Sequence, residues 1–248
     1  MLNKGWVFQQ SGESKWYQSV VPGCIHTDLL KNGLISDPFN RNTEKNLQWI
    51  NDKNWNYRLL FKVNEEILIK ENKTICFEGI DTYADIFLNG KKILSPSNMF
   101  HPWEKEISDI LKDGINELDV RFRSPIQEVL PQMDQLTYQL PADNDQAGKT
   151  SPFSRKAPFH YGWDWGPCFV TSGIWRNVSL IGWNDWLVKR SSIINCEVES
   201  NLAHLLLELD IISELNEEAS IFIEEPNAQI AFESSIDLKK GNNFFREK

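Results

Sequence analysis

The stretch YADIFLNGKKIL, residues 83–94, predicts two β-strands joined by a tight turn. Its first half places Ala84, Ile86 and Leu88 at alternate positions, with a second set of side chains between them. This period of two is the pattern of a strand with two distinct faces. Asn89-Gly90 follows, and both residues tolerate the positive φ angles of a type I′ turn. We therefore expect a β-hairpin here.

The same alternation recurs on both sides of this hairpin. Residues 55–63 place Trp55, Tyr57, Leu59, Phe61 and Val63 on one face, and further strands are expected at 74–77, 114–122 and 173–182. Helical spacing is confined to 22–30 and to 125–140, where Pro131 limits the helix. Many short strands separated by turns are typical of a β-sandwich.

Beyond residue 184 the strands follow a different rhythm. Alternating apolar residues at 203–211, 219–223 and 230–232 recur at intervals of about ten residues, as in an immunoglobulin-like sandwich. Only 65 residues remain from 184 to 248, whereas such a sandwich usually has about 100. We predict two domains, 1–185 and 186–248, the second of them partial because the polypeptide is truncated.

Composition excludes several classes of function. The net charge of −9 and the absence of a basic stripe argue against nucleic acid, and no run of eighteen apolar residues could span a membrane. With a native start at Met1, the lack of an apolar leader predicts a cytoplasmic protein. The four cysteines and four histidines show no metal-ligand spacing, and P-loop and dinucleotide motifs are absent, so we expect no metal and no cofactor.

Signals for catalysis within the chain are weak. There is no G-x-S-x-G elbow. Asp143 and Asp145 lie close together in a long polar loop, 141–158, where acids are usually only solvated. We therefore expect no catalytic residue in this chain.

The most unusual stretch is HYGWDWGP, residues 160–167, in which two tryptophans flank one aspartate. Five of the ten tryptophans fall between residues 163 and 186. Such a cluster forms either a core or a stacking surface.

Residues 155–176, which contain this motif, closely resemble the N-terminal domain of β-mannosidases in glycoside hydrolase family 2. The segments VPGCIHTDLL (21–30), NWNYR (54–58), FEGIDTYADIFLNG (77–90), HPW (101–103) and GINEL (114–118) are similar to the same domain. The resemblance covers about residues 1–185.

The resemblance implies an all-β fold: a jelly-roll-type, galactose-binding-like β-sandwich, then an immunoglobulin-like sandwich, then a TIM barrel that is missing here. In the family the barrel carries both catalytic glutamates. The resemblance further implies that Trp163 and Asp164 bind substrate, a β-mannoside or manno-oligosaccharide, beside that missing C-terminal barrel. A carboxylate accepts strong hydrogen bonds from sugar hydroxyls, and an indole packs on the apolar face of a pyranose.

Each motif residue also has a purely structural interpretation. Asp164 could cap its own turn, and Trp163 could pack against the barrel instead of the sugar. We expect core or interdomain packing for Trp165, backbone turns at Gly162 and Gly166, and a hydrogen-bonded structural role for His160. Outside the motif we expect Trp175 in a sheet, Arg176 paired with an acid, and Arg155 and Lys156 as solvated loop charges.

Three functions follow. The first is the non-catalytic, N-terminal portion of a retaining β-mannosidase that removes terminal β-D-mannose. The second is a stand-alone carbohydrate-binding module, and the third is a purely structural scaffold with Trp163 and Asp164 internal. A family-2 galactosidase or glucuronidase is disfavoured by GWDWGP.

Overall fold

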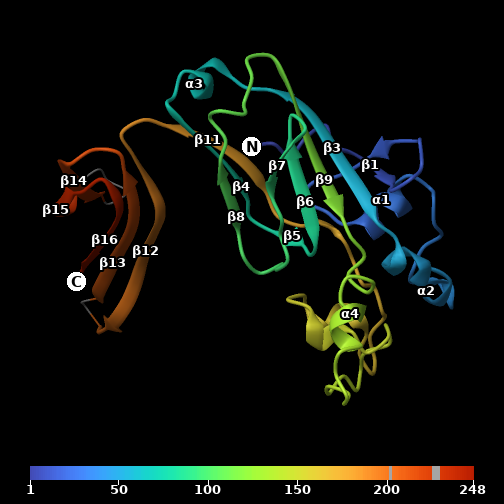
Figure 1. Ribbon diagram of the computed structural model, residues 1–248. Coiled ribbons are helices and arrows are strands. Elements are labelled where there is room, and N and C mark those ends of the chain that lie inside the picture. Colours follow the sequence, from blue (N-terminus) through green and yellow to red (C-terminus); the bar gives the residue numbers. More distant parts are fainter. Residues whose placement is uncertain (201–202, 225–229) are drawn as a thin grey trace. The chain divides into compact units, whose positions relative to one another are not determined.

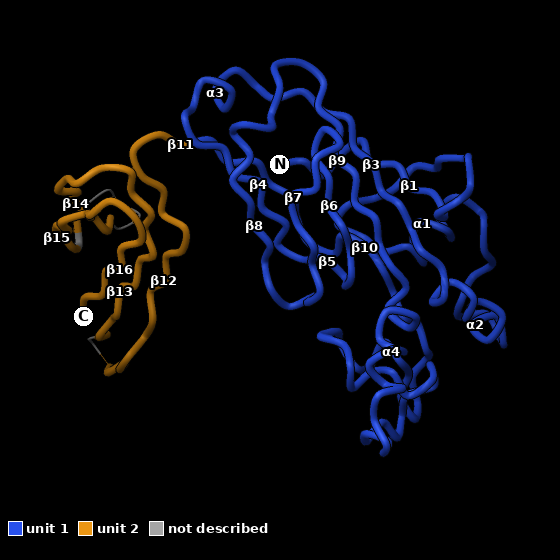
Figure 2. Tube along the Cα trace, viewed as in Figure 1, with its two compact units in different colours: residues 1–182 blue, residues 183–248 orange. Residues whose placement is uncertain are grey.

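The computed structural model describes residues 1–200, 203–224 and 230–248, and it divides into two compact units (Figure 2). The first unit comprises residues 1–182 and the second residues 183–248. The predicted boundary, after residue 185, lies three residues further along the chain.

Unit 1 is built on a six-stranded antiparallel sheet with the order β2-β1-β3-β9-β6-β7 (Figure 1). The strands are β1 (Val7–Gln10), β2 (Tyr17–Gln18), β3 (Trp55–Lys62), β6 (Ala84–Leu88), β7 (Lys91–Leu94) and β9 (Ile115–Phe122). The smaller sheets have the orders β11-β4-β8 and β10-β5. Their strands are β4 (Asn72–Phe77), β5 (Ile80–Asp81), β8 (Trp103–Glu106), β10 (Gly173–Ile174) and β11 (Val178–Trp183).

One hydrophobic core joins these sheets. It includes Tyr57 and Leu59 from β3, Val120 from β9, and Ile75 and Phe77 from β4. Alternate residues of β3 are buried, as the period of two predicts, because only one face of the strand meets the core. The all-β sandwich is therefore confirmed.

The predicted hairpin is also confirmed. Asn89 and Gly90 have φ angles of 52° and 82°, as a type I′ turn requires. The Asn89 side chain fixes the turn, because its Nδ2 donates to the carbonyl oxygen of Ile110 at 2.9 Å while its Oδ1 accepts from the backbone N–H of Glu117 at 3.0 Å.

Helices in unit 1 are short: α1 (Ile25–Lys31), α2 (Thr43–Asn46), α3 (Glu65–Leu68) and α4 (Leu130–Met133), with 3-10 turns at Gln48–Asp52, Ser151–Phe153 and Pro158–Tyr161. The helix expected within 22–30 is confirmed as α1. The expectation over 125–140 is wrong in extent: only α4 forms, because Pro131 fits solely in a first helical turn. The single strand expected over 173–182 is divided into β10 and β11.

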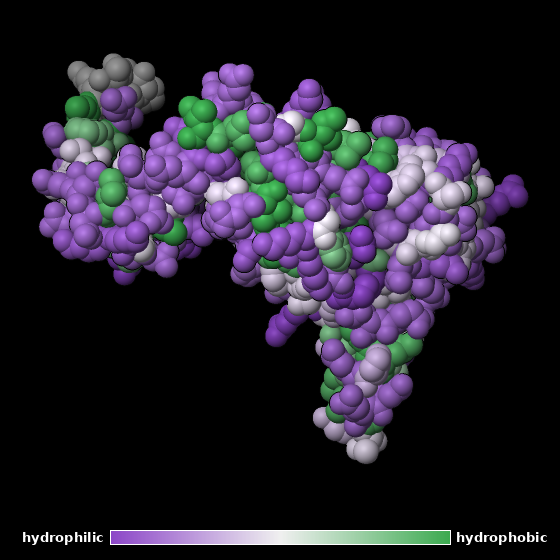
Figure 3. Space-filling model, turned by 45° about the horizontal axis from the view of Figure 1, so that its top comes forward, coloured by the Kyte–Doolittle hydropathy of each residue, from purple (hydrophilic) through white to green (hydrophobic). Residues whose placement is uncertain are grey.

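The chain between β9 and β10 forms a lobe beyond one end of the sheets, around α4 (Figure 1). Its own small core consists of Ile126, Tyr161, Cys168 and Val170. Hydrophobic residues also reach the surface of this lobe (Figure 3). The lobe carries the segment HYGWDWGP.

Unit 2 contains a three-stranded sheet, β12-β13-β16, and a two-stranded sheet, β14-β15. The strands are β12 (Trp186–Val198), β13 (Ala203–Ser213), β14 (Glu217–Glu224), β15 (Ile230–Leu238) and β16 (Gly241–Glu247). Leu207, Leu209 and Ile211 of β13 are buried with Leu238 of β15, so both sheets contribute to one core. The immunoglobulin-like identity of this unit stays a prediction.

Helix α1 brings two buried polar side chains into unit 1. The Asp28 carboxylate accepts hydrogen bonds from the hydroxyls of Ser19 and Tyr57, at 2.7 and 3.0 Å. His26 is 7% exposed, packs edge-on against Phe169 with ring centroids 5.4 Å apart, and has no hydrogen-bond partner at Nδ1. Burial, reinforced by the charge of Lys156, lowers the pKa of His26 to about 4.

The neighbouring leucines of β3 test the sandwich. Leu59 is 2% exposed and Leu60 is 59% exposed. Leu59→Ala is expected to lower the free energy of unfolding by about 2–5 kcal/mol, because it leaves a cavity in the core. Leu60→Ala is the matched control, with an expected change within about 0.5 kcal/mol. Urea unfolding measures both, and equal losses would contradict the assigned faces of β3.

A second prediction concerns the buried imidazole of His26. The unfolded chain binds a proton near pH 6.5, whereas the folded chain binds it only near pH 4. The free energy of unfolding should therefore fall as the pH drops from 6.5 to 4, by about 3 kcal/mol from this group. His26→Phe should remove this part of the pH dependence in urea titrations, while His101→Gln, at an exposed histidine, should retain it. An unchanged profile for His26→Phe would contradict the burial of His26.

Candidate functional site

The two tryptophans of the motif lie at the surface of the lobe and touch each other. Trp163 is 41% and Trp165 is 83% exposed, and their rings meet edge to face with centroids 5.8 Å apart. The segment bends instead of running as a strand. Core packing of Trp165, one of its two expected roles, is therefore wrong.

A hollow of about 670 Å³ lies beside these rings. It is lined by Pro158, Phe159, His160, Trp163, Trp165, Gly166, Pro167, Phe169 and Thr171. Aromatic rings form most of its walls, and His160 and Thr171 supply polar atoms. Apolar rings with a few polar groups suit the mixed surface of a sugar, whose C–H faces stack on indoles.

Asp164 is exposed, and one of its oxygens is already used. Its Oδ1 accepts a hydrogen bond from the backbone N–H of Trp165 at 3.1 Å. The turn-capping interpretation therefore holds for this one oxygen. Within the described ranges, Oδ2 makes no hydrogen bond and no ion pair. The carboxylate therefore keeps one oxygen available to an outside donor.

Gly162 of the motif has the expected backbone role, whereas for Gly166 the expectation stays a prediction. Gly162 is buried with a φ of 108°, and a Cβ there would approach the side chain of Gln146 to 3.0 Å. The Gln146 amide in turn donates to the carbonyl oxygen of Trp163 at 3.2 Å. Gly162 thus lets the chain turn beside Gln146 and leads directly to the exposed tryptophans.

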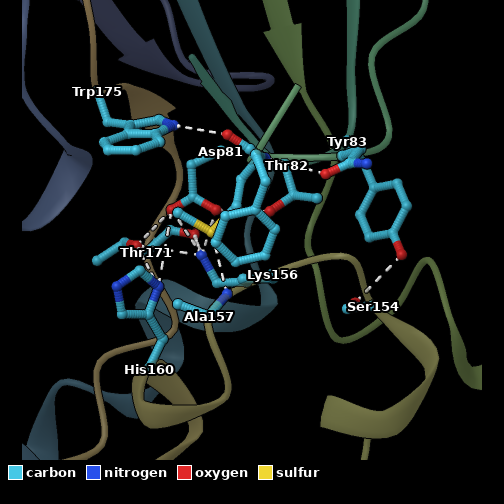
Figure 4. Close-up of polar contacts among 12 residues, drawn as sticks. Asp81, Thr82, Tyr83, Ser154, Lys156, Ala157, His160, Thr171 and Trp175 are labelled. Carbon is cyan, nitrogen blue, oxygen red and sulfur yellow. Dashed lines mark hydrogen bonds and ion pairs between the residues drawn. The ribbon is translucent and has the colours of Figure 1, made fainter. Parts of the chain in front are cut away.

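A buried ion pair lies at the base of this loop (Figure 4). The Lys156 ammonium is fully buried and contacts both oxygens of Asp81, at 2.5 and 2.6 Å. It also donates to the carbonyl and hydroxyl oxygens of Thr171, at 2.8 and 3.1 Å. The expectation that Lys156 is a solvated loop charge is therefore wrong, because the side chain is buried and paired with Asp81. The two residues are 75 positions apart in the sequence, so no local pattern indicates the pair.

The carboxylate at the centre of this network stays ionised. Burial alone would raise the pKa of Asp81, but the Lys156 ammonium and hydrogen bonds from Thr171 and Thr82 hold it below its usual value. Both hydroxyls lie 2.5 Å from the carboxylate. Asp81 thus accepts from an ammonium and two hydroxyls, which is what a buried carboxylate requires.

His160 joins the network through Thr171. Its Nδ1 lies 3.3 Å from the Thr171 hydroxyl oxygen, and burial with the nearby Lys156 charge lowers its pKa to about 4. Because the Thr171 proton is donated to Asp81, a neutral His160 donates from Nδ1 and leaves Nε2 as an acceptor. The expected hydrogen-bonded role of His160 agrees with this geometry.

The loop acids and the residues after the motif differ from expectation in part. Asp145 is buried and accepts the backbone N–H groups of Ala147 and Ser151 at 2.6 and 2.8 Å, so it is structural and not solvated, unlike the exposed Asp143. Trp175 lies between β10 and β11 and belongs to neither strand, so the expectation that it lies in a sheet is wrong.

Arg176 stacks on this tryptophan instead of pairing with an acid. Its guanidinium carbon lies 4.3 Å from the ring centroid of Trp175, and it makes no ion pair with the described part of the chain. Trp175 in turn donates from Nε1 to the carbonyl oxygen of Met99 at 3.1 Å. The expectation of an acidic partner for Arg176 is therefore wrong.

Among residues 1–200, 203–224 and 230–248, no group of three or more histidine, cysteine or acidic side chains could hold a metal ion. No helix in these ranges is long and apolar enough to cross a membrane.

The chain is similar to β-mannosidases over most of its length. It is 34% identical over 188 residues to the beta-mannosidase of Mus musculus, which is 74% of this chain and 21% of that protein. It is 36% identical over 183 residues to beta-mannosidase B of Thermothelomyces thermophilus, or 72% of this chain and 21% of that protein. The chain thus spans about a fifth of the length of these relatives.

Solved structures show the same likeness. The crystal structure of a beta-D-mannosidase from Dictyoglomus thermophilum matches 97% of this chain and 30% of its own, with a TM-score of 0.86 and 36% identity. The exo-chitosanase of Amycolatopsis orientalis matches 98% of this chain and 28% of its own, with a TM-score of 0.69, but at 17% identity it shows the fold alone.

The family model for the glycosyl hydrolase 2 galactose-binding domain-like family matches residues 6–176, which is more than half of the chain. These residues include the strands of the sandwich from β1 to β10 and the motif loop. The chain therefore belongs to this family of glycoside hydrolase family 2 domains.

Proposed function

We propose that this chain is the non-catalytic, N-terminal portion of a retaining β-mannosidase, and that Trp163 and Asp164 contribute to its sugar subsite. The observation that carries the proposal is the exposed aromatic hollow beside GWDWGP, in a chain similar to proteins named beta-mannosidase. The substrate would be a terminal, non-reducing β-D-mannose of a mannoside or manno-oligosaccharide.

The chemistry of the two residues fits this role. The unused Oδ2 of Asp164 accepts a sugar hydroxyl, and a charged acceptor makes that hydrogen bond stronger than a neutral one. The half-exposed indole of Trp163 offers an apolar face for the C–H groups of the pyranose. Neither group reacts with the glycosidic bond, so both would act by orienting the ring in the transition state.

The catalytic groups of the proposed enzyme would lie in a different domain. Retaining hydrolysis needs two carboxyl groups about 5–5.5 Å apart around the scissile bond. We place both in a C-terminal TIM barrel beyond residue 248, after the immunoglobulin-like unit. The cytoplasmic location remains a prediction from the sequence.

The chain alone is expected to be inactive. Residues 1–248, purified and incubated with p-nitrophenyl β-D-mannoside, should release no more nitrophenol than buffer does. Turnover that survives further purification would contradict the assignment of the catalytic carboxylates to another domain.

The role of Asp164 is tested in the full-length enzyme that this proposal implies. Loss of one or two charge-assisted hydrogen bonds in Asp164→Ala should lower kcat/KM by roughly 10- to 100-fold with little change in the unfolding midpoint. Asp143→Ala, at an exposed acid of the same lobe, is the matched control and should leave kcat/KM unchanged. Equal rates for both variants would favour a structural scaffold.

A stand-alone carbohydrate-binding module is the second candidate, because the exposed rings of Trp163 and Trp165 already line a hollow together with Phe159 and Phe169. Calorimetric titration of residues 1–248 with mannose and manno-oligosaccharides separates the two functions. Millimolar or tighter binding, abolished by Trp163→Ala, would favour the binding module. Absence of binding agrees with a subsite that needs the barrel.

A further inference from the structure

A buried polar network joins the two ends of the loop that carries the motif. Asp81 belongs to β5, whereas Lys156 and Thr171 lie at the two ends of the loop that carries GWDWGP. Figure 4 shows these three side chains converging, with His160 beside them. One carboxylate of the sandwich therefore binds both ends of the loop.

We call Asp81, Lys156 and Thr171 the clamp. Each of these three residues contacts the other two. Lys156 binds both oxygens of Asp81, the Thr171 hydroxyl donates to Asp81 Oδ2 at 2.5 Å, and Lys156 also binds both oxygens of Thr171. The side chains of Asp81 and Lys156 are 3% and 0% exposed. Water therefore competes little with these bonds, and screening by salt is weak.

The loop between Lys156 and β10 contains no β-strand, so strand pairing does not hold its middle. Between Lys156 and β10 the only regular element is the 3-10 turn Pro158–Tyr161. Tyr161 packs in the small core of the lobe, and the backbone N–H of Cys168 donates to Glu44 at 2.6 Å. These contacts fix parts of the loop. Backbone bonds also hold its two ends, because the Arg155 carbonyl accepts from the Met99 N–H at 3.0 Å and the Ser172 carbonyl accepts from the Ile25 N–H at 2.8 Å. The clamp is the side-chain network that joins the two ends to each other through Asp81.

The motif residues lie at the middle of the clamped segment. Trp163 is seven residues after Lys156, and Asp164 is seven residues before Thr171. Both are exposed, and the contact that reaches Trp163 from outside the loop is the Gln146 amide at 3.2 Å. Their position therefore depends on the base of the loop together with the contacts at Tyr161 and Cys168.

We propose that Asp81, Lys156 and Thr171 are positioning residues that hold the loop at 157–170 in the shape that presents Trp163 and Asp164 to the sugar. The relevance to sugar binding rests on the proposed function, whereas the effect on the loop does not. Preorganised contacts of this kind serve catalysis because the binding groups need no reordering when the substrate arrives.

Thr171 allows a test that spares the ion pair. Thr171→Val removes the hydroxyl and keeps the shape of the side chain, and Thr171→Ser restores the hydroxyl. Hydrogen–deuterium exchange of residues 1–248 should show amides in 158–170 exchanging at least tenfold faster in Thr171→Val, with strands β3 and β9 unchanged. Thr171→Ser should match the wild type. Lys156→Met should give the same local pattern, provided that it folds.

Asp119→Asn is the matched control. It breaks the Arg58–Asp119 ion pair of 2.7 Å between β3 and β9, so its faster exchange should be confined to those strands. No acceleration in 158–170 for Thr171→Val, or an equal acceleration throughout the chain, would overturn the positioning role.

The functional consequence has a separate readout. In the full-length enzyme, Thr171→Val should lower kcat for p-nitrophenyl β-D-mannoside about tenfold, with rescue by Thr171→Ser. If Thr171→Val loosens the loop while Asp164→Ala leaves kcat/KM unchanged, the clamp stands and the proposed function fails. If the loop stays rigid while Asp164→Ala is impaired, the proposed function stands and the clamp fails.

Discussion

The arrangement of the motif depends on the buried ammonium of Lys156, which needs an opposite charge and hydrogen-bond acceptors around it. The Lys156 ammonium is fully out of water, and a buried ion of this kind is tolerated only when its geometry and hydrogen bonds are nearly complete. Four oxygen contacts from Asp81 and Thr171 meet that requirement. A shift of the loop base would leave an uncompensated charge in the interior, so the base is held by these contacts.

The sandwich supplies the fixed half of this arrangement. Asp81 ends β5, which pairs with β10 through Gly173 and Ile174, only two residues beyond Thr171. A Cβ at Gly173 would lie 2.6 Å from the carbonyl oxygen of Gly23, so the backbone of β10 packs directly against the segment that leads into α1. The loop therefore leaves and re-enters the fold at positions set by strand pairing and close backbone contact.

The strands could be predicted from the sequence because their signals are local. The alternation in β3 and the Asn89-Gly90 turn each lie within a few residues, and the burial and φ angles agree with them. The wrong expectations concern contacts that are not local in the sequence. Lys156 was expected in solvent because nothing near it in the sequence indicates Asp81, and the buried Asp145 is satisfied by backbone groups that no side-chain pattern reveals. Long-range polar pairing leaves no periodic trace in the sequence.

Trp165 shows most clearly what the isolated fold leaves unexplained. An indole that is 83% exposed contributes little to the stability of unit 1, since hydrophobic stabilisation scales with the area removed from water. The ring nevertheless touches Trp163 edge to face on a loop whose ends are clamped. Part of the entropy cost of ordering these two side chains is therefore already met in the folded chain. A ligand or a facing protein surface that contacts the rings can still bury most of their apolar area. Asp164, between the two tryptophans in the sequence, supplies a charged acceptor that gives such a contact direction.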